Sequence, residues 1–233
     1  MRHSWLVAKR WYYAHKHTGE PLRSLFASDP PSPSDSLENV EIVALDIETT
    51  GLDAATADML SVGWVIIRGG RISLRTAESY IVQPSGDVGR SASVHGLTDT
   101  MVGEGHNWGF VLDKIVTVLD GRALLVHHAG LDKALLDRMC KRRYGARLLV
   151  PVVDTLAIEL RRQRNRHHEE SGGSLRLPSL RSEYGLPRYS SHDCLADALG
   201  AAELLNANVR NSKAKTLGDL LGRTHPGRCG KPR

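Results

Sequence analysis

The stretch Glu41-Ile42-Val43-Ala44-Leu45-Asp46-Ile47-Glu48-Thr49-Thr50-Gly51 decides the fold of this chain of 233 residues. Its apolar residues 42–45 predict a buried strand, and two acids follow where that strand ends. Asp46 and Glu48 alternate along an extended chain, so both side chains point to one face. Proteins of the α/β class place ligands at strand ends, and Gly51 lets the backbone approach a ligand closely. The stretch therefore predicts an acidic site at the end of a buried strand.

The patterns around this strand predict an α/β fold. Two β-rich runs, 60–67 and 71–82, follow it and are joined by Gly69-Gly70, which predicts a hairpin. Apolar periodicities then predict the remaining elements. They are a helix at 110–119, a strand at 123–126, a helix at 131–144, a strand at 148–153, and helices at 154–162, 177–184 and 194–209. This order predicts a mixed central sheet with a leading antiparallel meander, flanked by helices.

Composition divides the chain into three parts. Residues 40–210 hold most of the predicted strands and helices and form the expected domain. Residues 1–39 form an N-terminal extension, in which 1–16 predict an amphipathic helix packed on the domain and 27–38 predict a linker rich in proline and serine. Residues 211–233 are basic and contain glycine and proline, so we expect a frayed C-terminal tail.

The overall composition excludes several classes of protein and favours a polyanionic partner. No apolar run is long enough to span a bilayer, and the N-terminus lacks a signal-peptide core, so we expect a cytoplasmic protein without a membrane partner. The three cysteines are widely spaced and form no CxxC pair, which argues against a zinc knuckle or a disulfide framework. A net charge of +5 around an acidic site favours nucleic acid as the partner.

Two further segments supply the same chemistry as the first. His127-His128-Ala129-Gly130-Leu131-Asp132 follows a predicted buried strand, so Asp132 opens the next helix. His192-Asp193-Cys194-Leu195-Ala196-Asp197 places Asp197 on the first turn of the last long helix. We expect all three segments to meet at one cleft beside the sheet.

Four carboxylates in one cleft repel one another strongly, and divalent cations resolve that repulsion. Hard oxygen ligands favour Mg²⁺ or Mn²⁺ over zinc. Two such ions about 4 Å apart stabilise both the attacking and the leaving oxygen of a phosphoryl displacement. His192, five residues before Asp197, is placed to take the proton from the attacking water. The three segments together predict a nuclease site with two metal ions and a histidine base.

These motifs resemble those of the DEDDh (DnaQ-like) 3′→5′ exonucleases, the group that contains the proofreading epsilon subunit of bacterial DNA polymerase III. The first segment matches the family's D-x-E-T-T-G, and the third matches H-x-x-x-x-D. The second matches H-N-A-x-F-D, except that His128 stands for Asn and Leu131 for Phe. Supporting matches lie at 94–98, 154–156 and 177–180, and the resemblance covers about residues 40–208.

The resemblance implies an RNase-H-like fold and hydrolysis of nucleic acid from its free 3′ end, releasing nucleoside monophosphates. It implies a role for each residue that matches a motif. The implied ligands of two divalent cations, Mg²⁺ or Mn²⁺, are Asp46, Glu48, Asp132 and Asp197. The implied general base is His192, and the implied contacts of the terminal nucleotide are Thr49, Gly51, Leu52 and His95.

Three alternatives stay open beside a freestanding exonuclease that acts on single-stranded DNA. One is a proofreading subunit associated with a DNA polymerase. Only about 25 residues follow the domain, without an evident clamp-binding peptide, which favours the freestanding enzyme. Another is an exoribonuclease, because the sequence does not separate DNA from RNA. The last is an inactive module that binds a 3′ end, which the intact set of acids and histidine argues against.

Several polar residues near the motifs are better explained by structural roles. We expect His127 to bond backbone, Asp154 to cap a helix, and Asp193 to lie at a helix N-terminus. His167-His168-Glu169-Glu170 resembles a metal-binding run, but it falls in a polar stretch without helix or strand support. We therefore expect a solvated loop there.

Overall fold

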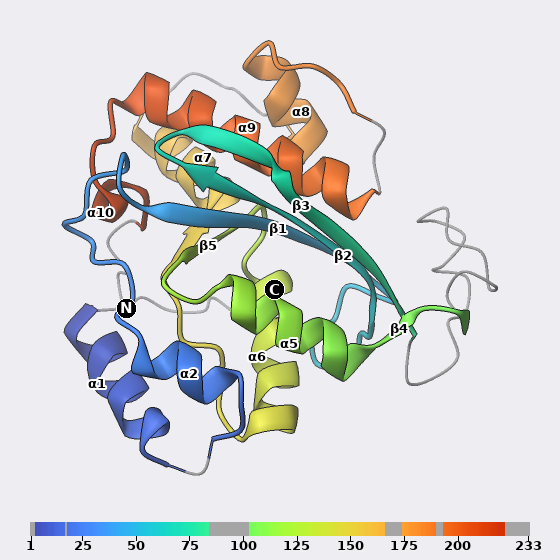
Figure 1. Ribbon diagram of the computed structural model, residues 1–233. Helices are drawn as coiled ribbons and strands as arrows, with labels where there is room; N and C mark the ends of the chain where they lie inside the picture. The colour runs from blue at the N-terminus through green and yellow to red at the C-terminus, as the bar shows by residue number, and fades with distance from the viewer. Residues whose placement is uncertain (1–2, 17, 84–102, 166–173, 190–192, 222–233) are drawn as a thin grey trace, which may run out of the picture.

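The computed structural model describes residues 3–16, 18–83, 103–165, 174–189 and 193–221 (Figure 1). The strands are β1 (Glu41–Thr49), β2 (Met59–Arg68), β3 (Arg71–Gln83), β4 (His106–Asn107), β5 (Ala123–Val126) and β6 (Val152–Asp154). The helices are α1 (His3–Ala14), α2 (Leu22–Ala27), α5 (Trp108–Val118), α6 (Asp132–Tyr144), α7 (Thr155–Asn165), α8 (Leu177–Glu183), α9 (Cys194–Ser212) and α10 (Leu217–Leu221).

The central sheet has the strand order β4-β3-β2-β1-β5-β6. β1, β2 and β3 form an antiparallel meander, whereas β5 is parallel to β1 and β6 is parallel to β5. The predicted mixed α/β fold is therefore confirmed. The strand expected at 148–153 begins only at Val152, because Pro151 has no N–H to donate to a ladder. β4 and α2 have no counterpart among the predicted elements.

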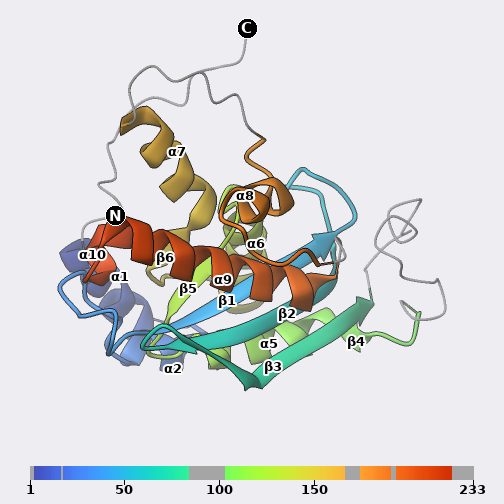
Figure 2. The same ribbon diagram turned by 90° about the horizontal axis from the view of Figure 1, so that it is seen from above.

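Helices cover both faces of the sheet (Figure 1). One face packs on α2, α5 and α6, and its buried strand residues include Val43, Leu45 and Val62. The other face packs on α9 and α10, and its buried strand residues include Ile42 and Ala44. Figure 2 shows α9 lying across the strands of the meander. Odd and even residues of β1 thus belong to different layers, which fixes where the acids at its end must point.

The N-terminal helix packs on the domain, as its amphipathic pattern predicted. Leu6 is buried in the same core cluster as α2, α5 and α6. Arg10 is also buried, at 2% exposure, and its guanidinium donates to the carbonyl oxygens of Leu149 at 2.9 Å and Ser28 at 2.8 Å. Backbone carbonyls therefore compensate the buried cation, although its burial still lowers the pKa of Arg10 to about 10.

The expectation that the chain frays after residue 211 is wrong for the described part. α9 continues to Ser212, and α10 buries Leu217 and Leu220 against the sheet face that α9 covers. The segment expected to be a linker runs alongside, where Ser36 and Thr216 form an isolated bridge. The basic, glycine-containing sequence suggested that this segment would stay disordered. The free energy gained by burying two leucines outweighs the entropy lost when its backbone is ordered. Residues 222–233 lie outside the described residues.

No described helix is both long enough and apolar enough to cross a bilayer.

Candidate active site

The two acids of β1 face the helix layer formed by α9. Ile42 and Ala44 pack in the core cluster on that side, and the alternation of the strand carries Asp46 and Glu48 onto the same face. Both belong to the end of β1, beyond the stretch that pairs with β5. The strand therefore places two carboxylates on this face, beyond its apolar residues Ile42 and Ala44.

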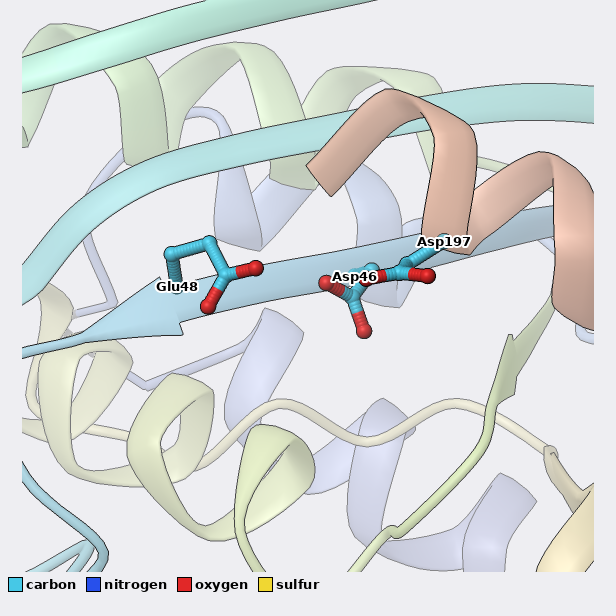
Figure 3. Close-up of side chains that lie close together, drawn as sticks. All are labelled: Asp46, Glu48 and Asp197. Atoms are coloured by element: carbon cyan, nitrogen blue, oxygen red, sulfur yellow. The ribbon is translucent and has the colours of Figure 1, made fainter. Parts of the chain in front are cut away.

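Asp197 reaches the same point from the first turn of α9 (Figure 3). Asp193 caps this helix, because its side chain accepts from the N–H groups of Leu195 and Ala196, each at 3.0 Å. One carboxylate oxygen each of Asp46, Glu48 and Asp197 lie within 4.8 Å of one another. We call these three residues the acidic cluster.

Gly63 allows α9 to approach closely enough to complete the acidic cluster. It pairs with Asp46 across the β1–β2 ladder. A Cβ atom at this position would lie 2.5 Å from the backbone nitrogen of Leu195 and 2.8 Å from the carbonyl carbon of Cys194. Only glycine fits that contact between strand and helix. An isolated glycine inside an apolar strand pattern is the sequence signal for such a close approach.

Asp132 opens α6 and is buried, at 6% exposure, but it does not join the group of three. Burial, followed by repulsion from Asp154 and Glu48, raises its pKa to about 7. Burial also raises the pKa of Asp46 well above its ordinary value, and repulsion from Asp132 and Asp197 adds to the effect. Asp46 thus lies in a poorly solvated region where the other three carboxylates act on it.

This arrangement fits divalent cations. Acids held together in a region of low dielectric favour protonation unless a cation compensates their charge. The cluster offers oxygen atoms only, which suits Mg²⁺ or Mn²⁺ better than softer metals. The chemistry of the donors thus fits a divalent cation at the acidic cluster.

The turn that follows β1, residues 49–52, comes directly after the two acids in the chain and is partly exposed to solvent. The Thr49 hydroxyl donates to the Gly51 carbonyl at 2.6 Å, which holds the turn. Leu52, in the same turn, is a large apolar side chain that is 90% exposed. His95 and His192, the other two expected site residues, lie outside the described residues.

Three neighbouring residues have the structural roles that the sequence predicted. His127 bonds the Thr155 hydroxyl at 2.8 Å through Nδ1 and the Leu175 carbonyl at 3.0 Å through Nε2. Asp154 accepts from the N–H of Leu156 at 2.9 Å, as a helix cap does. Its other oxygen accepts from the N–H of Ala129 at 3.0 Å, which fixes the turn that leads to α6. Asp193 lies at a helix N-terminus, as expected.

Comparison with known proteins identifies the class of protein. The family described as "Exonuclease" (RNase_T) matches residues 43–205. The chain therefore belongs to the exonuclease family, as the DEDDh motifs indicated. Members of this family are nucleases, which are hydrolases.

Curated relatives with similar sequences are described as DNA polymerase III PolC-type. That of Thermotoga petrophila is 29% identical over 172 residues, which cover 72% of this chain and 12% of the relative. That of Thermotoga maritima is 28% identical over 165 residues, covering 70% of this chain and 11% of the relative. The chain thus spans only about one eighth of the length of these relatives.

Solved structures of exonucleases share the fold. Exonuclease X in complex with 5′ overhanging duplex DNA has a TM-score of 0.58 at 19% identity, covering 78% of this chain and 99% of that one. Exonuclease I of E. coli in complex with an oligonucleotide has a TM-score of 0.63 at 16% identity, covering 78% of this chain and 42% of that one. These likenesses support the RNase-H-like fold expected from the sequence.

Proposed function

We propose that this protein is a metal-dependent 3′→5′ exonuclease that hydrolyses single-stranded DNA and releases nucleoside monophosphates. The observation that carries the proposal is the convergence of Asp46, Glu48 and Asp197 within 4.8 Å, with Asp132 acting electrostatically on the first two. Membership of the exonuclease family supports the reaction class. The cytoplasm remains its proposed location, because its relatives are DNA polymerases.

In this proposal the four carboxylates hold two divalent cations, Mg²⁺ or Mn²⁺. When bound, such ions would supply charge stabilisation for the attacking and the leaving oxygen of the phosphodiester. His192, in its neutral form, takes the proton from the attacking water. Thr49, Gly51, Leu52 and His95 contact the terminal nucleotide, and the exposed Leu52 side chain offers an apolar surface for its base.

A second candidate is a proofreading exonuclease that works with a DNA polymerase. Its support is the description of the curated relatives, which are PolC-type polymerases. Both candidates use the same site and differ in the partner. Removal of mismatched 3′ ends that is accelerated by added polymerase would favour proofreading, whereas unchanged rates would favour the freestanding enzyme.

The reaction and its direction can be tested with labelled strands. A single strand carrying a 5′ label should shorten progressively in Mg²⁺ or Mn²⁺, and a chemically blocked 3′ end should resist attack. Chelation with EDTA should abolish cleavage, because the carboxylates then lack the cations that the mechanism needs. A closed circular strand is the control. Efficient cutting of the circle would show that the protein is an endonuclease, and binding without any cleavage would favour the inactive module. Comparison of the cleavage rate with that on an RNA strand of the same sequence tests whether DNA or RNA is the preferred substrate.

Replacing Gly63 with alanine should lower turnover by up to about 10²-fold. The added Cβ displaces the first turn of α9, and a misplacement of about 1 Å at a catalytic centre has effects of that size. The decisive measurement is a Mn²⁺ titration of the rate. We expect a higher Mn²⁺ requirement, since Asp197 moves away from the other ligands.

Gly103→Ala is the matched control, because a Cβ there meets nothing within 4 Å. It should behave as the wild type. A folded Gly63→Ala protein with wild-type turnover and Mn²⁺ requirement would show that the approach of α9 does not set the geometry of the site.

A further inference from the structure

A groove of about 300 Å³ adjoins the acidic cluster beside α8 and the start of α9. Asp197 forms part of its lining, together with Ser179, Ser182, Arg188 and Tyr189. Its volume falls at the lower end of the range of about 300 to 1,000 Å³ typical of small-ligand sites. Because Asp197 belongs to both, the groove is continuous with the proposed site of hydrolysis. Its described lining includes no residue of the Thr49–Leu52 turn, which we assign to the terminal nucleotide.

The aromatic ring of Tyr189 is held in a fixed position at this groove. Its hydroxyl donates to Glu203 Oε1 at 2.8 Å, and the guanidinium of Arg181 lies 4.4 Å from the ring centroid. Arg181 is buried, at 4% exposure, and donates to the carbonyls of Gly200 at 2.8 Å and Pro187 at 2.7 Å. The ring therefore rests on a rigid support although 37% of the residue remains exposed.

A rigid, exposed aromatic ring suits the stacking of a nucleobase. Stacking is tolerant of sequence, because every base has a π face. The ring is already ordered by Glu203 and Arg181, so binding loses little side-chain entropy there. Arg188 lines the same groove and supplies a positive charge for a phosphate. An aromatic ring and a cation side by side are the elements that recognise a single strand without base specificity.

We propose that this groove is a second nucleotide subsite, in which an inner base of the substrate strand stacks on Tyr189 while Arg188 contacts a backbone phosphate. The inference rests on the proposed exonuclease function and extends it to a residue that the sequence motifs do not include. The subsite would hold the strand in place while the terminal nucleotide is cleaved, so it should contribute mainly to binding.

Binding is measured in the Asp46→Asn background, so that the result does not depend on turnover. The probe is a 5′-fluorescein oligothymidylate, followed by fluorescence anisotropy. Tyr189→Ala should raise its Kd about tenfold, a typical effect for loss of one stacked base. Tyr189→Phe keeps the ring and should bind nearly as the parent. Tyr12→Ala is the matched control, since Tyr12 is 49% exposed but lies on α1, across the sheet from α8.

A scan with abasic nucleotides separates stacking from a purely structural role of Tyr189. An abasic residue at one inner position near the 3′ end should weaken binding to the parent protein. The same substitution should cost nothing further in Tyr189→Ala, because the two changes remove one contact. Tyr189→Leu keeps bulk over Arg181 without a π face, and serves if the alanine variant unfolds.

The proposal is overturned if a folded Tyr189→Ala or Tyr189→Leu variant shows the parent's Kd and the same penalty at every abasic position. It is also overturned if Tyr189→Phe binds as weakly as Tyr189→Ala, since the hydroxyl and not the ring would then matter. The proposed function fails separately, through absence of cleavage by the wild type in Mg²⁺ and Mn²⁺.

Discussion

Asparagine in place of Asp46 is expected to abolish cleavage while leaving the fold intact. Asp132, Asp197 and Glu48 all act electrostatically on Asp46, and asparagine keeps its shape without its charge. The loss in turnover should exceed the factor of about 10 to 100 typical of residues that merely support metal ligands. The measurement is turnover on a 5′-labelled single strand in Mg²⁺ and in Mn²⁺. Retention of most activity would contradict the assignment of Asp46 as a ligand.

The same substitution should stabilise the protein when metal is absent, which separates loss of chemistry from loss of fold. The Asp132 pKa is raised to about 7 in the folded state, above its unfolded value of about 3.9. The folded state then binds more protons than the unfolded one, so the free energy of unfolding falls as pH rises from about 4 to about 7. Burial, with added repulsion from Asp132 and Asp197, also raises the pKa of Asp46, and an asparagine side chain carries no charge to be buried or repelled there.

Melting temperatures in EDTA at pH 5 and pH 8 test this reasoning. The wild type should be less stable at pH 8, where its buried carboxylates are ionised and repel one another, than at pH 5. Asp46→Asn should show a smaller difference in melting temperature between the two pH values. Mg²⁺ should raise the melting temperature of the wild type at pH 8 more than that of the variant. Equal pH dependence of both proteins would indicate that the four acids do not interact as the structure implies.

Replacement of His192 with glutamine is expected to lower turnover by about 10² to 10⁴, the usual contribution of a general base. Metal binding should persist, because the four carboxylates remain. An ordinary histidine titrates near pH 6.5, and a base must be neutral, so wild-type activity should rise with pH through that titration. The variant should lose this rising limb. The experiment compares pH–rate profiles at saturating Mg²⁺.

Asp193→Asn is the matched control for the neighbouring position. Asparagine caps helices about as well as aspartate, so the start of α9 should keep its place and the rate should change little. A His192→Gln protein with the wild-type rate and the same acid limb would exclude His192 as the base. A large loss in Asp193→Asn alone would instead assign the effect to the helix cap.

The elements that carry the site were predictable from sequence because their signals are local. The strand of Asp46 and Glu48 follows from an apolar run, and the side on which both acids lie follows from the period of two. The helix caps at Asp154 and Asp193 are predictable too, since a cap involves only the next few residues of the chain. The metal-binding roles of Asp46 and Glu48 are implied by the family resemblance, because local signals do not contain them.

Other features depend on contacts between distant residues, and the sequence patterns gave a wrong or incomplete result there. The segment after residue 211 looks disordered by composition, yet Leu217 and Leu220 are buried where the sheet offers apolar surface. The Tyr189 ring is fixed by Glu203 and Arg181, whose positions depend on how α8 packs against α9. Composition shows which apolar side chains a segment could bury. Only the tertiary structure shows whether the rest of the protein offers an apolar surface that covers them.

The sequence by itself determined that this protein presents acids at the end of a buried strand and at the starts of two helices. Only the tertiary structure decided that Asp197 comes within 4.8 Å of Asp46 and Glu48. The physical reason is the contact at Gly63, where the absence of a side chain lets the backbone of α9 lie directly on β2. Hydrogen bonding and side-chain alternation act over a few residues, whereas the distance between a helix and a strand is set by the packing of residues far apart in the chain.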